Sequence, residues 1–305
     1  MTIYVLRRIA LVFPVLVGVS IVTFLMSHLV PGDPVTVMLG TSATAANKAQ
    51  LREQLGLNDP LYVQYARYVS HASHGDLGRS IRSGQPVLRE ILDRVNSTLQ
   101  LTLTAMALAV VVGVGLGVAA AGSKNSAAQA GLMSFALIGI SVPSFWSGIL
   151  LILLFGLKLR WLPIAGGGPR ALVLPAITLA APAAAVLARM TRSTMLEVLN
   201  QDFVRTARAK GLGERVVVIR HALRNALIPV LTIIGLQFGG LLTGAVIVES
   251  VFSRPGLGRY AITAISSRDF PQIQGIVLLA AVVYVFVNLV VDLLYAVLDP
   301  RIRYR

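Results

Sequence analysis

Long apolar runs alternate along the chain with shorter polar segments. Six of the runs approach the ~20 residues that an α-helix needs to cross the hydrocarbon core of a membrane. They are Ile9–Val30, Leu99–Ala121, Gly131–Gly156, Ala171–Ala188, Leu227–Val248 and Gln274–Leu298. This pattern predicts an all-α integral membrane protein with six transmembrane helices and both termini on one side. Small residues inside the runs should let helices approach closely. They include Gly113, Gly115, Gly117, Gly235, Gly239, Gly240 and Gly244.

The first long polar segment, residues 31–98, follows the first run. Within it, Asn47–Leu57 and Pro60–Val69 are expected as short surface helices, followed by the turn-rich link His74–Ser80. Its aromatic and apolar residues favour a small packed cap over a plain loop. Long loops cross the membrane regardless of charge, so this segment can lie outside the cell.

The second long polar segment, residues 189–226, is basic and is called the basic segment below. It contains strong helix formers over Leu196–Lys210, a break at Gly211-Leu212-Gly213, and a helix-compatible stretch over Glu214–Asn225, which is followed by Pro229 just beyond the segment. The pattern predicts a helix, a glycine turn and a second helix that leads into a membrane span. A positively charged anchor would explain the arginines but not the glycine break. An ordered segment of this length instead predicts contact with another molecule.

Composition and charge support this assignment. Hydrophobic residues make up 55% of the 305 residues and charged residues only 13%, against ~25% in soluble domains. The net charge of +14 does not indicate nucleic-acid binding, because the basic residues lie between the apolar runs, where they set topology. With the N-terminus inside, the inner segments hold 14 Lys and Arg, against 6 in the two short outer loops.

The charge distribution therefore predicts the division of the chain and its place in the cell. The expected parts are a cytoplasmic N-terminus (1–8), a first transmembrane helix (9–30), an extracellular segment (31–98), a five-helix core (99–298) that includes a cytoplasmic loop (189–226), and a cytoplasmic tail (299–305). The protein is expected to be a multi-pass protein of the cytoplasmic membrane.

The sequence shows no evident set of catalytic residues and no chain of ionisable residues that could couple transport to an ion. The chain has no cysteine, no P-loop and no cluster of metal-ligating residues, so no cofactor or metal is expected. Asp292 is the clearest acidic residue at membrane depth, while Arg189 and Glu249 at span ends are explained by snorkelling. An integral-membrane enzyme, an ion-coupled carrier and a purely structural membrane protein are the alternatives. They are disfavoured in turn by the missing catalytic residues, by the few buried charges and by the ordered basic segment.

Several motifs resemble one family along essentially the whole chain. The stretch Arg205-Thr206-Ala207-Arg208-Ala209-Lys210-Gly211-Leu212, with Arg220–Pro229 after it, closely resembles the EAA-type cytoplasmic loop of ABC importer permeases. The B-type subunit of the dipeptide/oligopeptide family is the most similar. The other matching motifs are Tyr4–Arg8, Pro31–Pro34, Gly75–Ser80, Ser141–Trp146, Glu249–Gly258 and Asp299–Arg303.

The resemblance implies an ABC importer type I-like permease fold and a subunit without catalytic activity. The implied partners are a homologous second permease, two cytoplasmic ATP-binding subunits or one fused ATPase chain, an extracytoplasmic substrate-binding protein and membrane lipid. The implied cargo is a di- or oligopeptide or a similar small solute. The ATPase-coupling residues would be Arg205, Thr206, Ala207, Arg208, Ala209, Lys210, Gly211, Leu212 and Gly213. In this family the helix around Thr206–Leu212 acts as a coupling helix. The chain departs from the general motif, because Arg205 and Thr206 replace its acidic residue and Glu197 or Asp202 would supply that charge.

Overall fold

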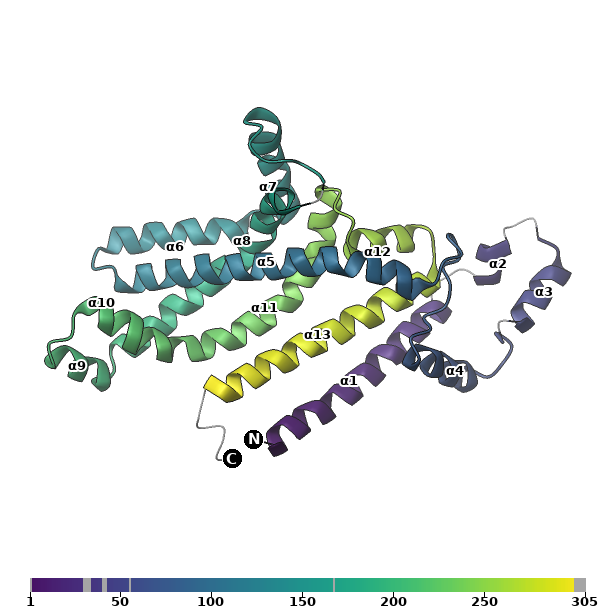
Figure 1. Cartoon of the computed structure of the whole chain (residues 1–305), viewed down its shortest axis with the longest axis horizontal. Coiled ribbons are helices and arrows are strands. Elements are labelled where there is room, and N and C mark those ends of the chain that lie inside the picture. The colour runs from purple at the N-terminus through teal and green to yellow at the C-terminus, as the bar shows by residue number, and fades with distance from the viewer. Residues whose placement is uncertain (1, 30–33, 40–42, 55, 167, 299–305) are drawn as a thin grey trace. The chain divides into compact units, whose positions relative to one another are not determined.

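The computed structural model describes residues 2–29, 34–39, 43–54, 56–166 and 168–298 (Figure 1). The side chains of residues 2–9, 27, 29, 34, 37, 38 and 291–298 are outside the description, and Asp292 is among them. In these ranges the regular structure is helical, apart from an isolated bridge between Arg79 and Pro86. The elements are α1 (Thr2–Leu29), α2 (Pro34–Leu39), α3 (Ala45–Gln54), α4 (Leu61–Ser73), α5 (Val87–Gly122), α6 (Ser126–Ser141), α7 (Ser144–Leu151), the π-helical η1 (Ile152–Lys158), α8 (Pro169–Leu199), α9 (Asp202–Ala209), α10 (Glu214–Val216), the π-helical η2 (Val217–Ala222), α11 (Leu223–Val251), α12 (Leu257–Ser266) and α13 (Phe270–Leu298).

Four described helical stretches are long and apolar enough to cross a membrane. They are Val87–Gly122, Pro169–Leu199, Glu214–Val251 and Phe270–Val290. The described apolar part of α1, Ala10–Met26, is shorter. The all-α fold and the multi-pass character are therefore confirmed, whereas the count of six spans stays a prediction.

The third expected span is not one straight helix. α6 ends at Ser141 and α7 begins at Ser144, and the two helical parts are bent by 102° at this break. The proline ring at position 143 disfavours a helical conformation in the residue before it, and Val142 is extended (φ −97°, ψ 123°). The apolar run Gly131–Gly156 is therefore a broken span or a re-entrant loop.

The chain divides into two compact units. Of the described residues, unit 1 comprises those within Ser97–Arg254 and those from Phe286 onward, and unit 2 comprises those within Thr2–Asn96 and Pro255–Val285. In unit 1, α8 is the central helix, since most of its apolar stretch is buried. It packs against α6, α7 and α11. The apolar core of this unit includes Leu101 of α5, Leu187 of α8 and Val248 of α11.

Small residues bring α5 and α6 against the α8 backbone. A Cβ atom added to Gly113 would lie 2.6 Å from the carbonyl oxygen of Ala184, and one added to Gly139 would lie 2.5 Å from that of Ala181. Gly117 is equally close to α8. The expectation of close approach is thus confirmed for Gly113 and Gly117. For Gly115 and Gly240 it is wrong, because no atom of the described residues lies within 4 Å of the added Cβ atom.

Glu249, near the end of α11, is completely buried within unit 1. The hydroxyl of Thr98 in α5 donates a hydrogen bond of 2.5 Å to its Oε1 atom. The expectation that Glu249 snorkels to solvent is therefore wrong, because the side chain is enclosed by protein and receives a donor there. Arg189, by contrast, is exposed.

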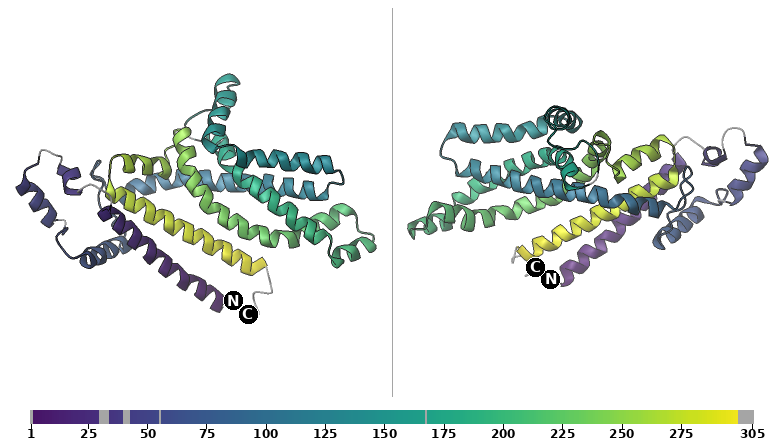
Figure 2. Two further views of the ribbon diagram at one scale, coloured as in Figure 1. Left: turned by 180° about the vertical axis from the view of Figure 1, so that it is seen from behind. Right: turned by 45° about the horizontal axis from the view of Figure 1, so that its top comes forward.

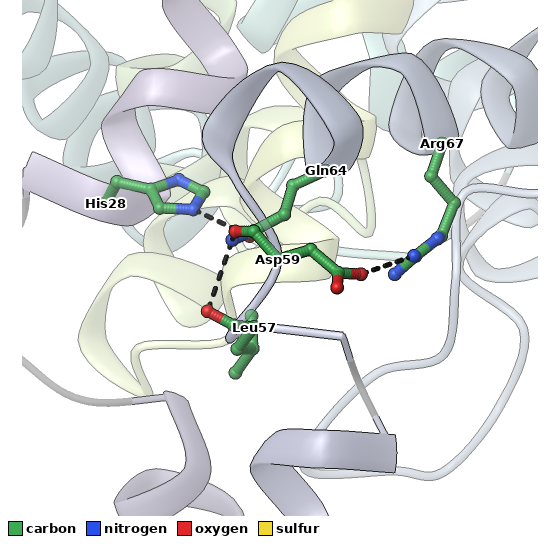
Figure 3. Close-up of polar contacts among 5 residues, drawn as sticks. All are labelled: His28, Leu57, Asp59, Gln64 and Arg67. Carbon is green, nitrogen blue, oxygen red and sulfur yellow. Dashed lines mark hydrogen bonds and ion pairs between the residues drawn. The ribbon is translucent and has the colours of Figure 1, made fainter.

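In unit 2, α4 of the first polar segment packs on α1. Phe24 lies edge-on to Tyr65 of α4, with ring centroids 5.5 Å apart. The amide of Gln64 contacts His28 of α1 through its oxygen (3.1 Å) and donates to the carbonyl oxygens of Leu57 and Asp59 (3.2 and 2.8 Å; Figure 3). One side chain thus fixes the start of α4 to α1. The expected helices Asn47–Leu57 and Pro60–Val69 correspond to α3 and α4.

The remainder of unit 2 consists of the beginning of α5, α12 and the first part of α13, which pack together. Its apolar core contains Val87, Ile91, Leu257 and Ile276. α1 and the first part of α13 run side by side in both views of Figure 2, where the Gln274 side chain donates to the carbonyl oxygen of Thr23 (3.3 Å).

Candidate functional site

The basic segment contains the end of α8, a compact helical hairpin and the beginning of α11. α8 ends at Leu199, a turn at Asn200 and Gln201 follows, and α9 occupies Asp202–Ala209. α10 begins at Glu214 and continues through η2 into α11 without a gap. We call Asp202–Val216 the α9–α10 hairpin. The expected single helix Leu196–Lys210 is therefore two helices, while the predicted turn and the second helix are confirmed.

The turn of the hairpin is a Schellman motif centred on Gly211. The Gly211 N–H donates to the carbonyl oxygen of Arg208 (2.9 Å), and the Leu212 N–H donates to that of Ala207 (3.4 Å). Gly211 has a φ of +79°, a left-handed conformation that residues with a Cβ atom rarely adopt. There is open space around it, so the backbone conformation, and not crowding, requires glycine here. Gly213 has an ordinary φ of −62°.

An ion pair connects the two helices across the turn. The Arg208 guanidinium donates to both carboxylate oxygens of Glu214, with Nη2–Oε1 at 2.6 Å and Nε–Oε2 at 3.1 Å. The hydrogen bond from Arg208 is the main cause that lowers the pKa of Glu214, and the charge of Lys124 lowers it further. The same bond raises the pKa of Arg208. Two-point contacts of this kind fix direction as well as distance.

Buried apolar side chains fix the hairpin to the ends of α8 and α11 within unit 1. Val204 and Ala207 of α9 belong to one buried cluster with Met195 and Val198 of α8 and with Val217 of η2. Ala222 and Ala226 extend the cluster into α11. The hairpin is therefore packed against the ends of two helices that are long enough to span a membrane.

The outer side of the hairpin combines exposed apolar and basic residues. Phe203 and Leu212 are each 39% exposed, Val216 is also exposed, and Ile219 of η2, just beyond the hairpin, is exposed as well. Exposed apolar patches that are rimmed by polar residues mark interaction surfaces. A π-helical turn such as η2 is also frequent at functional sites.

The structure brings the nine expected coupling residues together on this hairpin. Ala207 is buried and the other eight are exposed. Thr206 bonds to the carbonyl oxygen of Asp202 in its own helix (3.0 Å), and Arg205 lies 3.7 Å from the Asp202 carboxylate. Sequence reasoning missed Phe203 and the role of Glu214. The signal for Glu214 was an acid placed just after a glycine turn that follows a helix with an arginine.

Comparisons with known proteins agree with this architecture. Residues 113–304 match the sequence profile of the binding-protein-dependent transport system inner membrane component, and residues 1–102 match the N-terminal part of such membrane components. The dipeptide transport system permease protein DppB of Alkalihalophilus pseudofirmus is 44% identical, with 99% of each chain covered. The glutathione transport system permease protein GsiC of Salmonella paratyphi A is 47% identical, again with 99% of each chain covered.

Among solved structures, a chain of the inward-facing MetNI methionine ABC transporter is similar in fold. Its TM-score is 0.57 at 17% sequence identity, and the match covers 68% of this chain and 96% of that chain. At this identity the likeness concerns the arrangement of helices alone.

Proposed function

The chain belongs to the family of binding-protein-dependent transport system inner membrane components, and on this premise we propose how it works as the permease subunit of a peptide ABC importer. The α9–α10 hairpin docks on a cytoplasmic ATPase subunit and transmits its movement to the membrane helices. The cargo is a small peptide, in keeping with relatives named as dipeptide and glutathione permeases.

The observation that carries this proposal is a rigid hairpin with an exposed docking face. Phe203 and Leu212 offer apolar contact. Lys210 offers positive charge, and so does Arg205, whose guanidinium lies 3.7 Å from the exposed Asp202 carboxylate. Arg208 is held by Glu214, so we assign it to shaping the hairpin and not to contacting an acid on the partner. This choice refines the expectation from sequence, which placed Arg208 against the ATPase.

The buried cluster supplies the path of transmission. A displacement of α9 acts on α8 through Val204 and on α11 through Val217, because these side chains pack in one apolar core. Packed cores shift between discrete arrangements and do not deform continuously. ATP-driven closure of the partner subunits would therefore reorient α8 and α11 as bodies.

The importer needs ATPase and binding-protein partners. We propose in addition that a homologous second permease completes the pathway and that two ATPase subunits, or one fused ATPase chain, dock below it. We place the chain in the cytoplasmic membrane among its lipids, with both termini in the cytoplasm, because the basic residues are concentrated in the segments on that side.

Purification of the tagged full-length chain in mild detergent tests the docking face. We expect a P-loop ATPase to co-purify with the wild type and to be lost from Leu212→Asp. The matched control is Leu61→Asp on α4, because Leu61 is 53% exposed and lies far along the chain in unit 2. Equal recovery of the ATPase with both variants would contradict the proposal.

A further inference from the structure

Unit 2 contains a polar cavity that the proposed function does not use. The cavity has a volume of about 510 Å³ and lies between the beginning of α5, the turn that follows Ser80, and α12. This volume falls within the ~300–1,000 Å³ of small-molecule sites. Apart from the Tyr260 ring, the described residues of its lining include no large apolar side chain. The cavity therefore suits a polar solute better than a lipid chain.

Positive charge predominates in the lining. Among the described residues of the lining, Arg82, Arg94 and Arg259 contribute three guanidinium groups, whereas Glu90 contributes one carboxylate. Arg94 is held in place, since its guanidinium carbon lies 4.2 Å from the centre of the Tyr260 ring. Guanidinium groups bind carboxylates through two parallel hydrogen bonds, which gives both strength and direction.

The floor of the cavity is a connected hydrogen-bond network. The buried amide of Gln272 donates to Glu90 Oε2 (3.0 Å) and to Ser80 Oγ (2.7 Å), and Ser80 in turn donates to the buried carboxylate of Asp269 (2.7 Å). The Tyr260 hydroxyl donates to the same Glu90 oxygen. Burial and this contact raise the pKa of Tyr260, which keeps the hydroxyl protonated as a donor.

This network settles the role of the two acids. Asp269 is enclosed and accepts hydrogen bonds from Ser80 and from the backbone N–H of Arg82, so it fixes the turn that carries Arg82. Glu90 is oriented by Tyr260 and Gln272 at the cavity wall. A preorganised wall of this kind lowers the cost of ordering side chains when a ligand binds.

We infer that this cavity binds the carboxylate end of a peptide-sized solute, with Arg82 and Arg259 as the groups that receive the carboxylate. The uncharged side chains of Ser83, Thr263 and Ser267 in the lining then face the amide groups of the ligand. The choice of a peptide rests on the proposed function, whereas the preference for a carboxylate rests on the cavity alone. The site would hold cargo on one subunit, before it passes between subunits.

Equilibrium binding to the full-length chain in lipid nanodiscs tests this inference. The probes are a radiolabelled dipeptide and the same dipeptide with an amidated C-terminus, in which an uncharged amide of similar size replaces the carboxylate. We expect the free acid to bind about tenfold more tightly than the amide, the effect of losing a charge-assisted hydrogen bond. Equal affinities, or no binding of the free acid, would overturn the inference without the need for any variant.

Substitutions then locate the site. Arg82→Gln and Arg259→Gln should each weaken binding of the free acid about tenfold and leave the amide unchanged. Arg89→Gln is the matched control, because Arg89 is an exposed arginine of α5 outside the cavity lining. An equal loss in the Arg89 variant would overturn the assignment.

Competition with inorganic phosphate shows whether the cavity prefers a carboxylate or binds any oxyanion. Inorganic phosphate should not displace the dipeptide at matched concentration, and displacement would instead indicate a general oxyanion site. These assays need no ATPase. If the wild-type chain retains its ATPase but binds no dipeptide, this inference is overturned and the proposed function is not. If a Leu212→Asp chain has lost its ATPase but still binds the dipeptide, this inference is supported without the proposed function.

Discussion

The guanidinium of Arg208 lies against the carboxylate of Glu214 across the Gly211 turn, with Nη2–Oε1 at 2.6 Å and Nε–Oε2 at 3.1 Å. Both groups are well exposed, so the contact adds little to the stability of the whole protein. Its consequence is local, because it sets the angle between α9 and α10. A hairpin whose angle is fixed can transmit a push, whereas a loose one would absorb it.

Loss of this ion pair should loosen the hairpin. The chain has no cysteine, so spin labels on Thr206→Cys and Ile219→Cys can report the distance across it. In the double-cysteine chain that is otherwise unchanged, we expect a narrow distribution of distances between the two labels, measured by pulsed electron paramagnetic resonance. Adding Glu214→Gln should broaden this distribution. Glu197→Gln, which changes another exposed acid, should resemble the wild type.

The pH dependence of the same distance follows from the lowered pKa of Glu214. Since the pKa in the folded state lies below the ordinary 4.5, the ion pair is complete above that value and is lost only as the pH falls through the lowered pKa. The wild-type distribution should therefore stay narrow down to pH 4.5 and broaden below it. Broadening at a higher pH would show that another group controls the hairpin.

The left-handed conformation of Gly211 predicts a graded effect on uptake. Alanine at this position costs ~1–2 kcal/mol because of its Cβ atom. Proline cannot reach a φ of +79° and also lacks the N–H that donates to Arg208. We expect Gly211→Ala to reduce peptide uptake and Gly211→Pro to abolish it, with normal membrane insertion. Gly131→Ala in α6, a helical position with room for a Cβ atom among the described residues, is the control and should be silent. Normal uptake by Gly211→Pro would refute the rigid-hairpin account.

Close packing of α5 on α8 predicts a stability effect of Gly117→Ala. The new Cβ atom would lie 2.6 Å from the Cβ of Thr191 and 2.7 Å from the carbonyl oxygen of Ala188, so the helices must separate. Overpacking of this kind costs ~1–3 kcal/mol. Thermal unfolding in detergent should show a lower Tm for Gly117→Ala and no loss for Gly115→Ala, which enters open space. Equal Tm values for the two variants would mean that α5 does not pack closely on α8 at Gly117.

The buried carboxylate of Glu249 predicts a difference between two substitutions of Thr98. Valine has the shape of threonine but removes the hydroxyl that donates to Glu249, whereas serine retains it. Loss of a donor to a buried polar group costs ~1–3 kcal/mol. We therefore expect a lower Tm for Thr98→Val than for Thr98→Ser in the same thermal assay. The opposite order would indicate that the methyl group, and not the hydroxyl, matters at this position.

The apolar runs predicted the long helices well, because a membrane leaves a chain few other ways to satisfy its backbone. The bend at Pro143 was not predictable in the same way. Proline is also present inside α8 at Pro182 and inside α11 at Pro229, where both helices continue. Whether a proline bends a membrane helix depends on what packs around it, and the sequence does not contain that information locally.

In the candidate site, too, some features were predictable from the sequence and others were not. The break at Gly211 was predictable, because glycine interrupts a run of helix formers. The ion pair was not, since Glu214 meets Arg208 only when the turn has its left-handed geometry. The burial of Glu249 depends on Thr98, which is 151 residues away along the chain.

The central claim is that the α9–α10 hairpin is the surface that meets the ATPase, and site-directed cross-linking tests it most directly. A cysteine at Phe203, in a chain with no cysteine of its own, is treated with a bifunctional reagent in native membranes, and the products are identified by mass spectrometry. The control is a cysteine at Tyr62 of α4, which is 76% exposed in unit 2. The account predicts a cross-link to a P-loop ATPase from Phe203→Cys and none from Tyr62→Cys. A link from Tyr62→Cys, or an ATPase that co-purifies without any link from Phe203→Cys, would contradict it.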